Sequence, residues 1–164
     1  MTEMLFTSLT AGFLGSAITV IYTGLIERHR RRLELMSAVV GWVNEAYSLI
    51  QFLHGRKDAC YRGKKIDRRE YRIQSRALRD LLLSNDALKA QVAILYGEGR
   101  AMQMMNALNG HMLAAAQSLW TARSTNWGTV GPALMASFAD TIDPLRSSFE
   151  RELLRATRSA WRPY

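Results

Sequence analysis

The chain has few of the residues that build covalent or metal-based sites. Its one cysteine among 164 residues, Cys60, cannot form an intramolecular disulfide, which suits a reducing compartment. Its three histidines, His29, His54 and His111, have no second histidine or glutamate three or four residues away. A zinc site needs several such ligands on one face. We therefore expect no metal and no cofactor.

Catalytic motifs are also missing. The sequence has no glycine-rich phosphate loop ending in Lys-Ser or Lys-Thr and no dinucleotide fingerprint. The segment "YGEGR" at 96–100 holds two glycines but follows a helical pattern rather than a strand. Helical ribonucleases of the HEPN type place a histidine four to six residues after an arginine, whereas ten residues separate Arg100 from His111. These absences predict a protein that is not an enzyme.

Three prolines and no alternating stretch between hairpin turns leave helices as the expected elements. The apolar spacing predicts a helical rod to about residue 53, a polar connection at 55–63 and a helix capped by Asp67 that ends near Leu83. Shorter patterns predict helices at about 87–96 and 101–122. A last helix is expected from Pro132 onward, kinked rather than interrupted at Pro144. Together these patterns predict an all-α bundle.

Charge is absent from residues 4–26, and this run determines the expected location. As a helix, 23 residues span about 34 Å, enough for a hydrocarbon core of roughly 30 Å. Glu3 is the one charge before the run, and four arginines follow it closely: Arg28, Arg30, Arg31 and Arg32. The positive-inside rule then predicts an uncleaved, single-pass transmembrane anchor at 1–26 in a bacterial inner membrane. Its N-terminus would lie outside and a helical domain at 27–164 in the cytoplasm. A buried core helix is the alternative.

Small and polar residues recur along one face of this run: Ser8, Gly12, Gly15, Ser16, Thr19 and Thr23. Such residues let helix backbones approach closely in lipid, so they predict packing in a homo-oligomer or the lining of a pore. Ordinary anchor composition would explain them equally simply. Beyond the run, an apolar seam of Leu33, Met36, Val40, Val43, Tyr47 and Ile50 would extend the association.

Arginine carries most of the net charge of +8, since only four of the 22 basic residues are lysines. A GC-rich genome would explain this bias too. On the helix after Asp67, one face carries Arg68, Arg72, Arg76 and Arg79. Aligned like charges repel, so the stripe predicts a counter-charge: anionic lipid, nucleic acid or nucleotide, or an acidic partner protein. A merely solvated face is the alternative.

The outline of an uncharged N-terminal run, an arginine flank and a helical remainder resembles the small single-span membrane effectors of bacterial anti-phage defence. The resemblance implies a homo-oligomer that permeabilises the membrane under control of a nucleotide or nucleic acid. It rests on no residue motif. A membrane-anchored scaffold in a larger complex is the alternative, with partners that include the lipid bilayer and proteins of the same system.

Overall fold

The computed structural model describes the backbone of residues 2–159 and the side chains of residues 19–158 except that of Ser124. Six α-helices make up this part: α1 (Thr2–Tyr61), α2 (Arg68–Leu83), α3 (Asp86–Tyr96), α4 (Arg100–Thr121), α5 (Trp127–Ser137) and α6 (Asp143–Ser159). A 3-10 turn at Ser124–Asn126 precedes α5, and a π-helical turn at Phe138–Ile142 joins α5 to α6. No strand occurs in residues 2–159. The predicted all-α bundle is confirmed.

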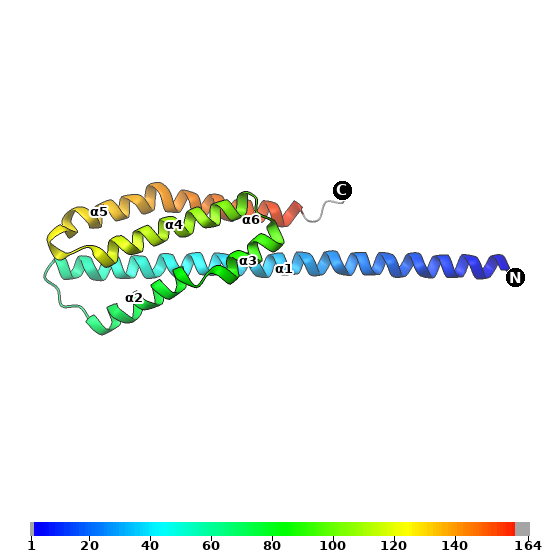
Figure 1. The fold of residues 1–164 in the computed structure, drawn as a ribbon, viewed down its shortest axis with the longest axis horizontal. Helices are drawn as coiled ribbons and strands as arrows, with labels where there is room; N and C mark the ends of the chain where they lie inside the picture. Colours follow the sequence, from blue (N-terminus) through cyan, green and yellow to red (C-terminus); the bar gives the residue numbers. More distant parts are fainter. Residues whose placement is uncertain (1, 160–164) are drawn as a thin grey trace.

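One long helix organises the molecule. With 60 residues, α1 is about 90 Å long, and it runs along the whole bundle and well beyond it. Figure 1 shows α2 on one side of α1, with α4 and the continuous arm of α5 and α6 on the other. The chain reverses at the far end of the bundle, where α1 ends, α2 begins and α4 turns into α5. Residues from all four helices therefore meet at that end.

The predicted transmembrane helix at the N-terminus is corrected. In the part of the chain open to description, no helix combines the length and the apolar character needed to cross a bilayer. The described side chains of the run cover only residues 19–26, about 12 Å of helix, before Glu27 and the arginines follow. A hydrocarbon core needs about 20 apolar residues in succession. The side chains of residues 4–18 lie outside the described part.

The core face of α1 differs from the predicted seam. Val43 and Ile50 of that seam are buried, but Leu33 is 42% exposed. The centre of the face is instead formed by Leu35, Val39, Trp42, Ala46 and Leu53. The spacing of the seam suits packing against α1 of another copy. In the structure, α1 packs instead against helices of its own chain on more than one side. The apolar surface between residues 35 and 53 is therefore used within the bundle.

Helix α1 also continues into the segment 55–63, which was predicted as a polar connection, and ends only at Tyr61. Contacts with the rest of the fold hold this last stretch. Lys57 Nζ donates to the Leu119 carbonyl, and the Arg56 guanidinium lies 2.8 Å from the Glu70 carboxylate. The capping prediction for α2 holds at Asp67, whose carboxylate accepts from the backbone N–H groups of residues 69 and 70. The Asp67-to-Glu70 spacing also predicts a capping box, in which Glu70 would accept from the backbone N–H of Asp67, but Glu70 pairs with Arg56 instead.

The second half of the chain follows its apolar pattern closely. The spacing on α4 predicts an apolar face of Ala101, Met105, Leu108, Met112, Ala115, Leu119 and Ala122. All of these are buried except Ala122, which is partly buried just beyond the end of the helix. Helix α5 begins at Trp127, five residues before the predicted start, so Pro132 lies inside it. The predicted continuity past Pro144 is confirmed, because α5, the π-helical turn and α6 follow one another without a gap. A π-helical turn precedes Pro144, and one extra residue in that turn makes room for a ring that a regular helix would exclude.

Replacing Gly131 with alanine should destabilise the fold. A Cβ there would lie 2.9 Å from the Trp127 ring, which is 1% exposed, so the ring or the backbone would have to shift. Overpacking of this kind costs about 1–3 kcal/mol. Chemical denaturation would measure the free energy of unfolding. Gly110→Ala on α4 is the control: its Cβ meets open space, so it should gain up to about 1 kcal/mol in helix propensity. Equal effects of the two changes would contradict the packing at Trp127.

Candidate anion-binding groove

The predicted packing residues of the N-terminal run fall in two groups. The side chains of Ser8, Gly12, Gly15 and Ser16 lie outside the described residues. Thr19 and Thr23 are exposed, and the Thr23 hydroxyl donates to the Thr19 carbonyl oxygen at 2.6 Å. This bond stays within one helix, so it says nothing for or against contact with another. The role of this stripe stays a prediction.

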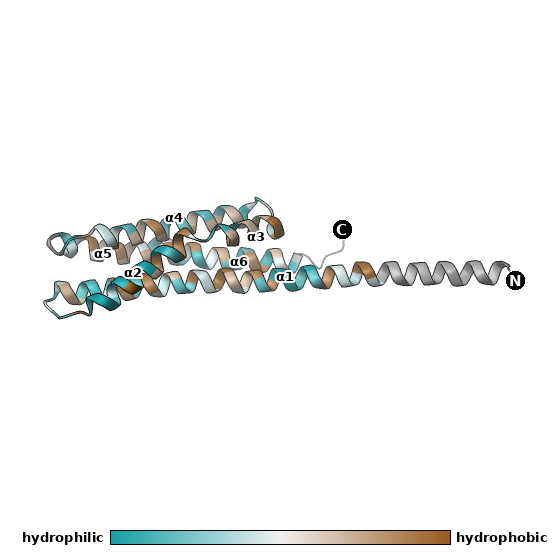
Figure 2. Ribbon diagram, turned by 60° about the horizontal axis from the view of Figure 1, so that its bottom comes forward, coloured by the Kyte–Doolittle hydropathy of each residue, from teal (hydrophilic) through white to brown (hydrophobic). Residues whose placement is uncertain are grey.

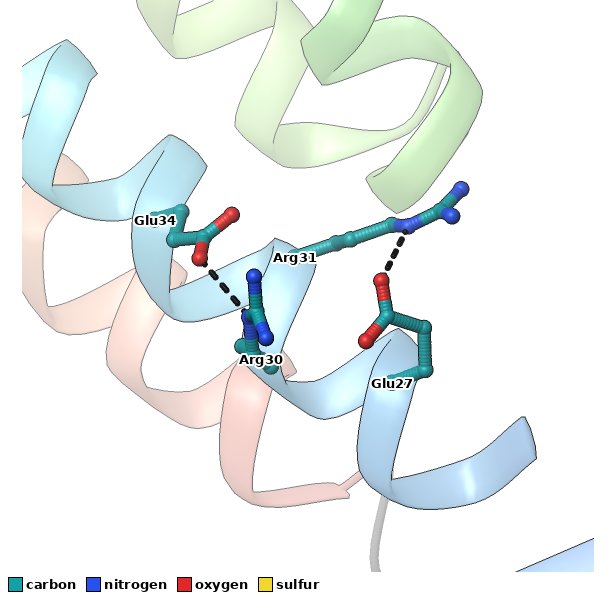
Figure 3. A network of polar contacts seen from close by, with 4 residues as sticks. All are labelled: Glu27, Arg30, Arg31 and Glu34. Carbon is teal, nitrogen blue, oxygen red and sulfur yellow. Dashed lines mark hydrogen bonds and ion pairs between the residues drawn. The ribbon is translucent and has the colours of Figure 1, made fainter. Parts of the chain in front are cut away.

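The four arginines after the run do not form one basic cluster. Arg30 pairs with Glu34 and Arg31 with Glu27, both at 2.9 Å and one helical turn apart (Figure 3). Arg32 turns to the bundle, where it donates to the Ala156 carbonyl at 3.1 Å and lies over the Tyr96 ring. Arg28 is exposed. Because glutamates stand one turn from two of these arginines, the local positive charge is lower than the arginine count alone predicts.

The arginine stripe of α2 keeps its charge. Arg68, Arg72, Arg76 and Arg79 are all exposed, and none forms an ion pair with another described residue. Arg76 and Arg79 line a groove of about 500 Å³ between α2 and α4. Its other lining residues are Ser75, Leu83, Leu113, Gln117 and Trp120. Arg68 and Arg72 are not among the lining residues, so the stripe divides into a groove pair and an outer pair.

Burial of the opposite face of α2 turns the arginines outward. Leu78 and Leu82 are 0% and 1% exposed, and the indole N–H of Trp42 on α1 donates to the Leu81 carbonyl at 3.1 Å. Burying a leucine contributes about 1.5–3 kcal/mol. Figure 2 shows hydrophilic and hydrophobic residues alternating along α2. The orientation of the stripe therefore follows from the apolar residues between the arginines.

A second cavity, of about 660 Å³, adjoins the groove at the end of the bundle where the chain reverses. Ser75 and Trp120 line both spaces, so the two lie side by side. The cavity is rich in aromatic rings, with cationic side chains among them and no acidic group among its described lining residues. The rings belong to Tyr61, Tyr71, Trp120 and Trp127, and the cations are Lys57 and Arg123. Cys60, exposed, also lines it.

Lys57 and Trp127 support each other on the cavity wall. The ammonium group lies 5.4 Å from the centre of the Trp127 ring while it donates to the Leu119 carbonyl. Burial lowers the pKa of Lys57 and raises the pKa of Tyr71, because each charged form loses hydration there. Trp120 adds a buried indole N–H with no acceptor among the described residues. The cavity thus offers aromatic faces beside one partly buried ammonium group and one exposed guanidinium group.

Sequence reasoning found the arginines and missed the cavity. Its rings come from α1, α2, α4 and α5, and no periodicity connects positions 61, 71, 120 and 127. One signal was available: two of the four tryptophans lie within eight residues of each other at the break between two helices. No histidine is among the residues that line the groove or the cavity. His54 donates to the Gly131 carbonyl at 3.1 Å, and His111 is exposed.

No protein-family model matches the chain, and neither the curated proteins nor the solved structures include a significantly similar one. Among the described residues there is also no group of three or more histidine, cysteine, aspartate or glutamate side chains placed to hold a metal ion. The resemblance to anti-phage effectors stays a prediction from outline. The site is interpreted from its own geometry.

Lys57→Met should change how stability depends on pH. Because burial lowers the lysine pKa below 10.5, the unfolded chain holds more protons than the folded one between the lowered value and 10.5. Across that window the wild type gains stability as pH rises, and the methionine variant lacks this gain. Denaturation curves from neutral pH to pH 10.5 would give the difference in unfolding free energy. If the difference in unfolding free energy between the wild type and the variant does not change with pH, the burial of this ammonium group is contradicted. Lys65→Met, at an exposed position, controls for the loss of charge alone.

Proposed function

We propose that the protein is a binding subunit rather than an enzyme, and that its α2–α4 groove binds the phosphates of a nucleotide or nucleic acid. The observation that carries the proposal is the pair Arg76 and Arg79, which line a groove without any acidic partner among the described residues. Arginine offers a planar fork of donors that matches phosphate oxygens. Its charge does not titrate near neutral pH.

The surroundings favour phosphate over a carboxylate-bearing protein surface. The groove wall opposite the arginines consists of Leu113, Gln117 and Trp120 on α4. These side chains suit a sugar or base beside the phosphates and leave no acidic residue to repel them. The positive net charge adds a long-range attraction that speeds the approach of any polyanion.

The membrane-permeabilising effector stays a prediction from the sequence, as does its location in the inner membrane. The corrected transmembrane helix forms no part of the present proposal. The scaffold alternative agrees better with a binding subunit. A groove can bind a ligand while a projecting helix contacts another protein of the complex.

Groove binding makes a sharp prediction about salt. The full chain should bind a fluorescent single-stranded oligonucleotide, and fluorescence anisotropy over a salt series should give a linear fall of log affinity with log salt. In the double variant Arg76→Gln and Arg79→Gln the slope should drop by about 1.4, since each phosphate contact on a single strand adds about 0.7. The affinity at low salt should fall as well.

The matched control is Arg68→Gln with Arg72→Gln, which removes the same charge from the same helix outside the groove. It should have the smaller effect on affinity and slope. Two outcomes contradict the groove: wild-type protein that does not bind at low salt, or two double variants that behave alike. The second outcome would leave only a diffuse attraction between charges.

We propose self-association through the projecting part of α1 as a second function. Ile21, Tyr22, Leu25 and Ile26 are 64%, 58%, 47% and 41% exposed, and on a helix they lie on one face. Figure 2 shows this hydrophobic stretch beyond the bundle. Contiguous exposed apolar surface of this kind marks an interaction site. A second copy offers the same face and could bury it.

Sedimentation of the purified full chain tests this proposal. The wild type should form an oligomer, and Ile21→Asn with Leu25→Asn should shift it toward monomer without unfolding the bundle, because these exposed side chains are not part of the buried core. Thr23→Asn is the comparison, because a residue two positions from both lies on the far side of the helix, where the small-residue stripe runs; a larger effect there would favour packing through that stripe instead. A monomeric wild type, or equal effects of the two variants, would refute association through this face.

A further inference from the structure

We infer that the aromatic cavity binds the ring of a nucleoside phosphate whose phosphates contact Arg76 and Arg79 in the adjoining groove. The inference rests on the proposed function and narrows its ligand. It separates a nucleoside phosphate, which would use both spaces, from a bare phosphate chain, which would use the groove alone.

The two spaces lie in the order that such a ligand needs. Ser75 and Trp120 border both the cavity and the groove. Arg76 follows Ser75 in sequence, and Arg79 stands one helical turn after it on the same side of α2. A ligand with its ring beside Trp120 in the cavity therefore extends along α2 directly to the two guanidinium groups.

The cavity has the size and lining of a small-molecule site. Ligand cavities measure about 300–1,000 Å³, and this one measures about 660 Å³. Tyr71 and Trp120 are both partly exposed, so their rings are available for contact with a ligand ring. Bases stack on such rings with little dependence on sequence. Trp127 is 1% exposed and already covered by Lys57, so it serves as the floor of the cavity.

Polar groups at the cavity suit the edge of a base. The buried N–H of Trp120 has no acceptor among the described residues, and an unmade hydrogen bond of this kind costs free energy. A ring nitrogen or carbonyl oxygen of a base could supply such an acceptor, provided that the indole rotates, because its N–H is covered in this structure. Arg123, at the turn after α4, brings a further positive charge to the lining.

Calorimetry on the full chain tests the inference with two kinds of probe at one ionic strength. The first probes are the four ribonucleoside triphosphates, and the second is inorganic triphosphate, which carries the phosphates without a ring. At least one nucleotide should bind about tenfold more tightly than inorganic triphosphate, because stacking contributes this much or more. In Trp120→Leu this preference should fall below about twofold, and Trp120→Phe should keep most of it. Because inorganic triphosphate has no ring to stack, its affinity should change less than that of the nucleotide in both variants.

The outcomes separate the two proposals. If inorganic triphosphate binds with steep salt dependence and no nucleotide binds more tightly, the ring site is overturned and the groove stands. If Trp120→Leu keeps the preference while its circular dichroism matches the wild type, the ring site is also overturned. If neither the nucleotides nor inorganic triphosphate bind at low salt, both proposals fall. Arg76→Gln with Arg79→Gln should weaken both kinds of probe.

Discussion

Burial of one face of α1 is the constraint on which the rest of the structure depends. The face from Leu35 to Leu53 is almost completely buried, and α2, α3, α4, α5 and α6 all pack against α1. Each large apolar side chain on it contributes about 1.5–3 kcal/mol, whereas an exposed ion pair contributes at most about 1 kcal/mol. The exposed Arg30–Glu34 and Arg31–Glu27 pairs therefore add little to the stability of the fold, which depends mainly on the apolar face. The groove exists because α2 and α4 meet on this one support.

The same packing explains where the charge goes. A helix with leucines on one side and arginines on the other has a single stable orientation on an apolar surface, and α2 adopts it. Its arginines then stand in solvent without carboxylates to neutralise them. On α1 the outcome is different, because Glu27 and Glu34 stand one turn from two arginines and Arg32 reaches α6 and Tyr96. Two arginine-rich segments that look alike in the sequence thus differ in their free positive charge.

The end of the bundle concentrates the unusual chemistry of the chain. Lys57 loses hydration there, the Trp120 indole N–H has no acceptor among the described residues, and Gly131 allows the Trp127 ring to lie against the backbone of α5. Such features carry a cost in stability that an ordinary core avoids. They occur together beside the groove arginines, and this coincidence is the physical argument for a ligand at that end.

The sequence by itself determined the helical class, the cap at Asp67 and the buried face of α4, because each depends on spacing within one helix. It also identified the arginine stripe. It misjudged the N-terminal transmembrane helix, the centre of the core face on α1 and the segment at 55–63. The last two depend on which other helices lie alongside, and that is a property of the tertiary structure. The cavity was beyond sequence reasoning for the same reason: its rings come from four helices, and only packing around α1 brings Tyr71, Trp120 and Trp127 to one space.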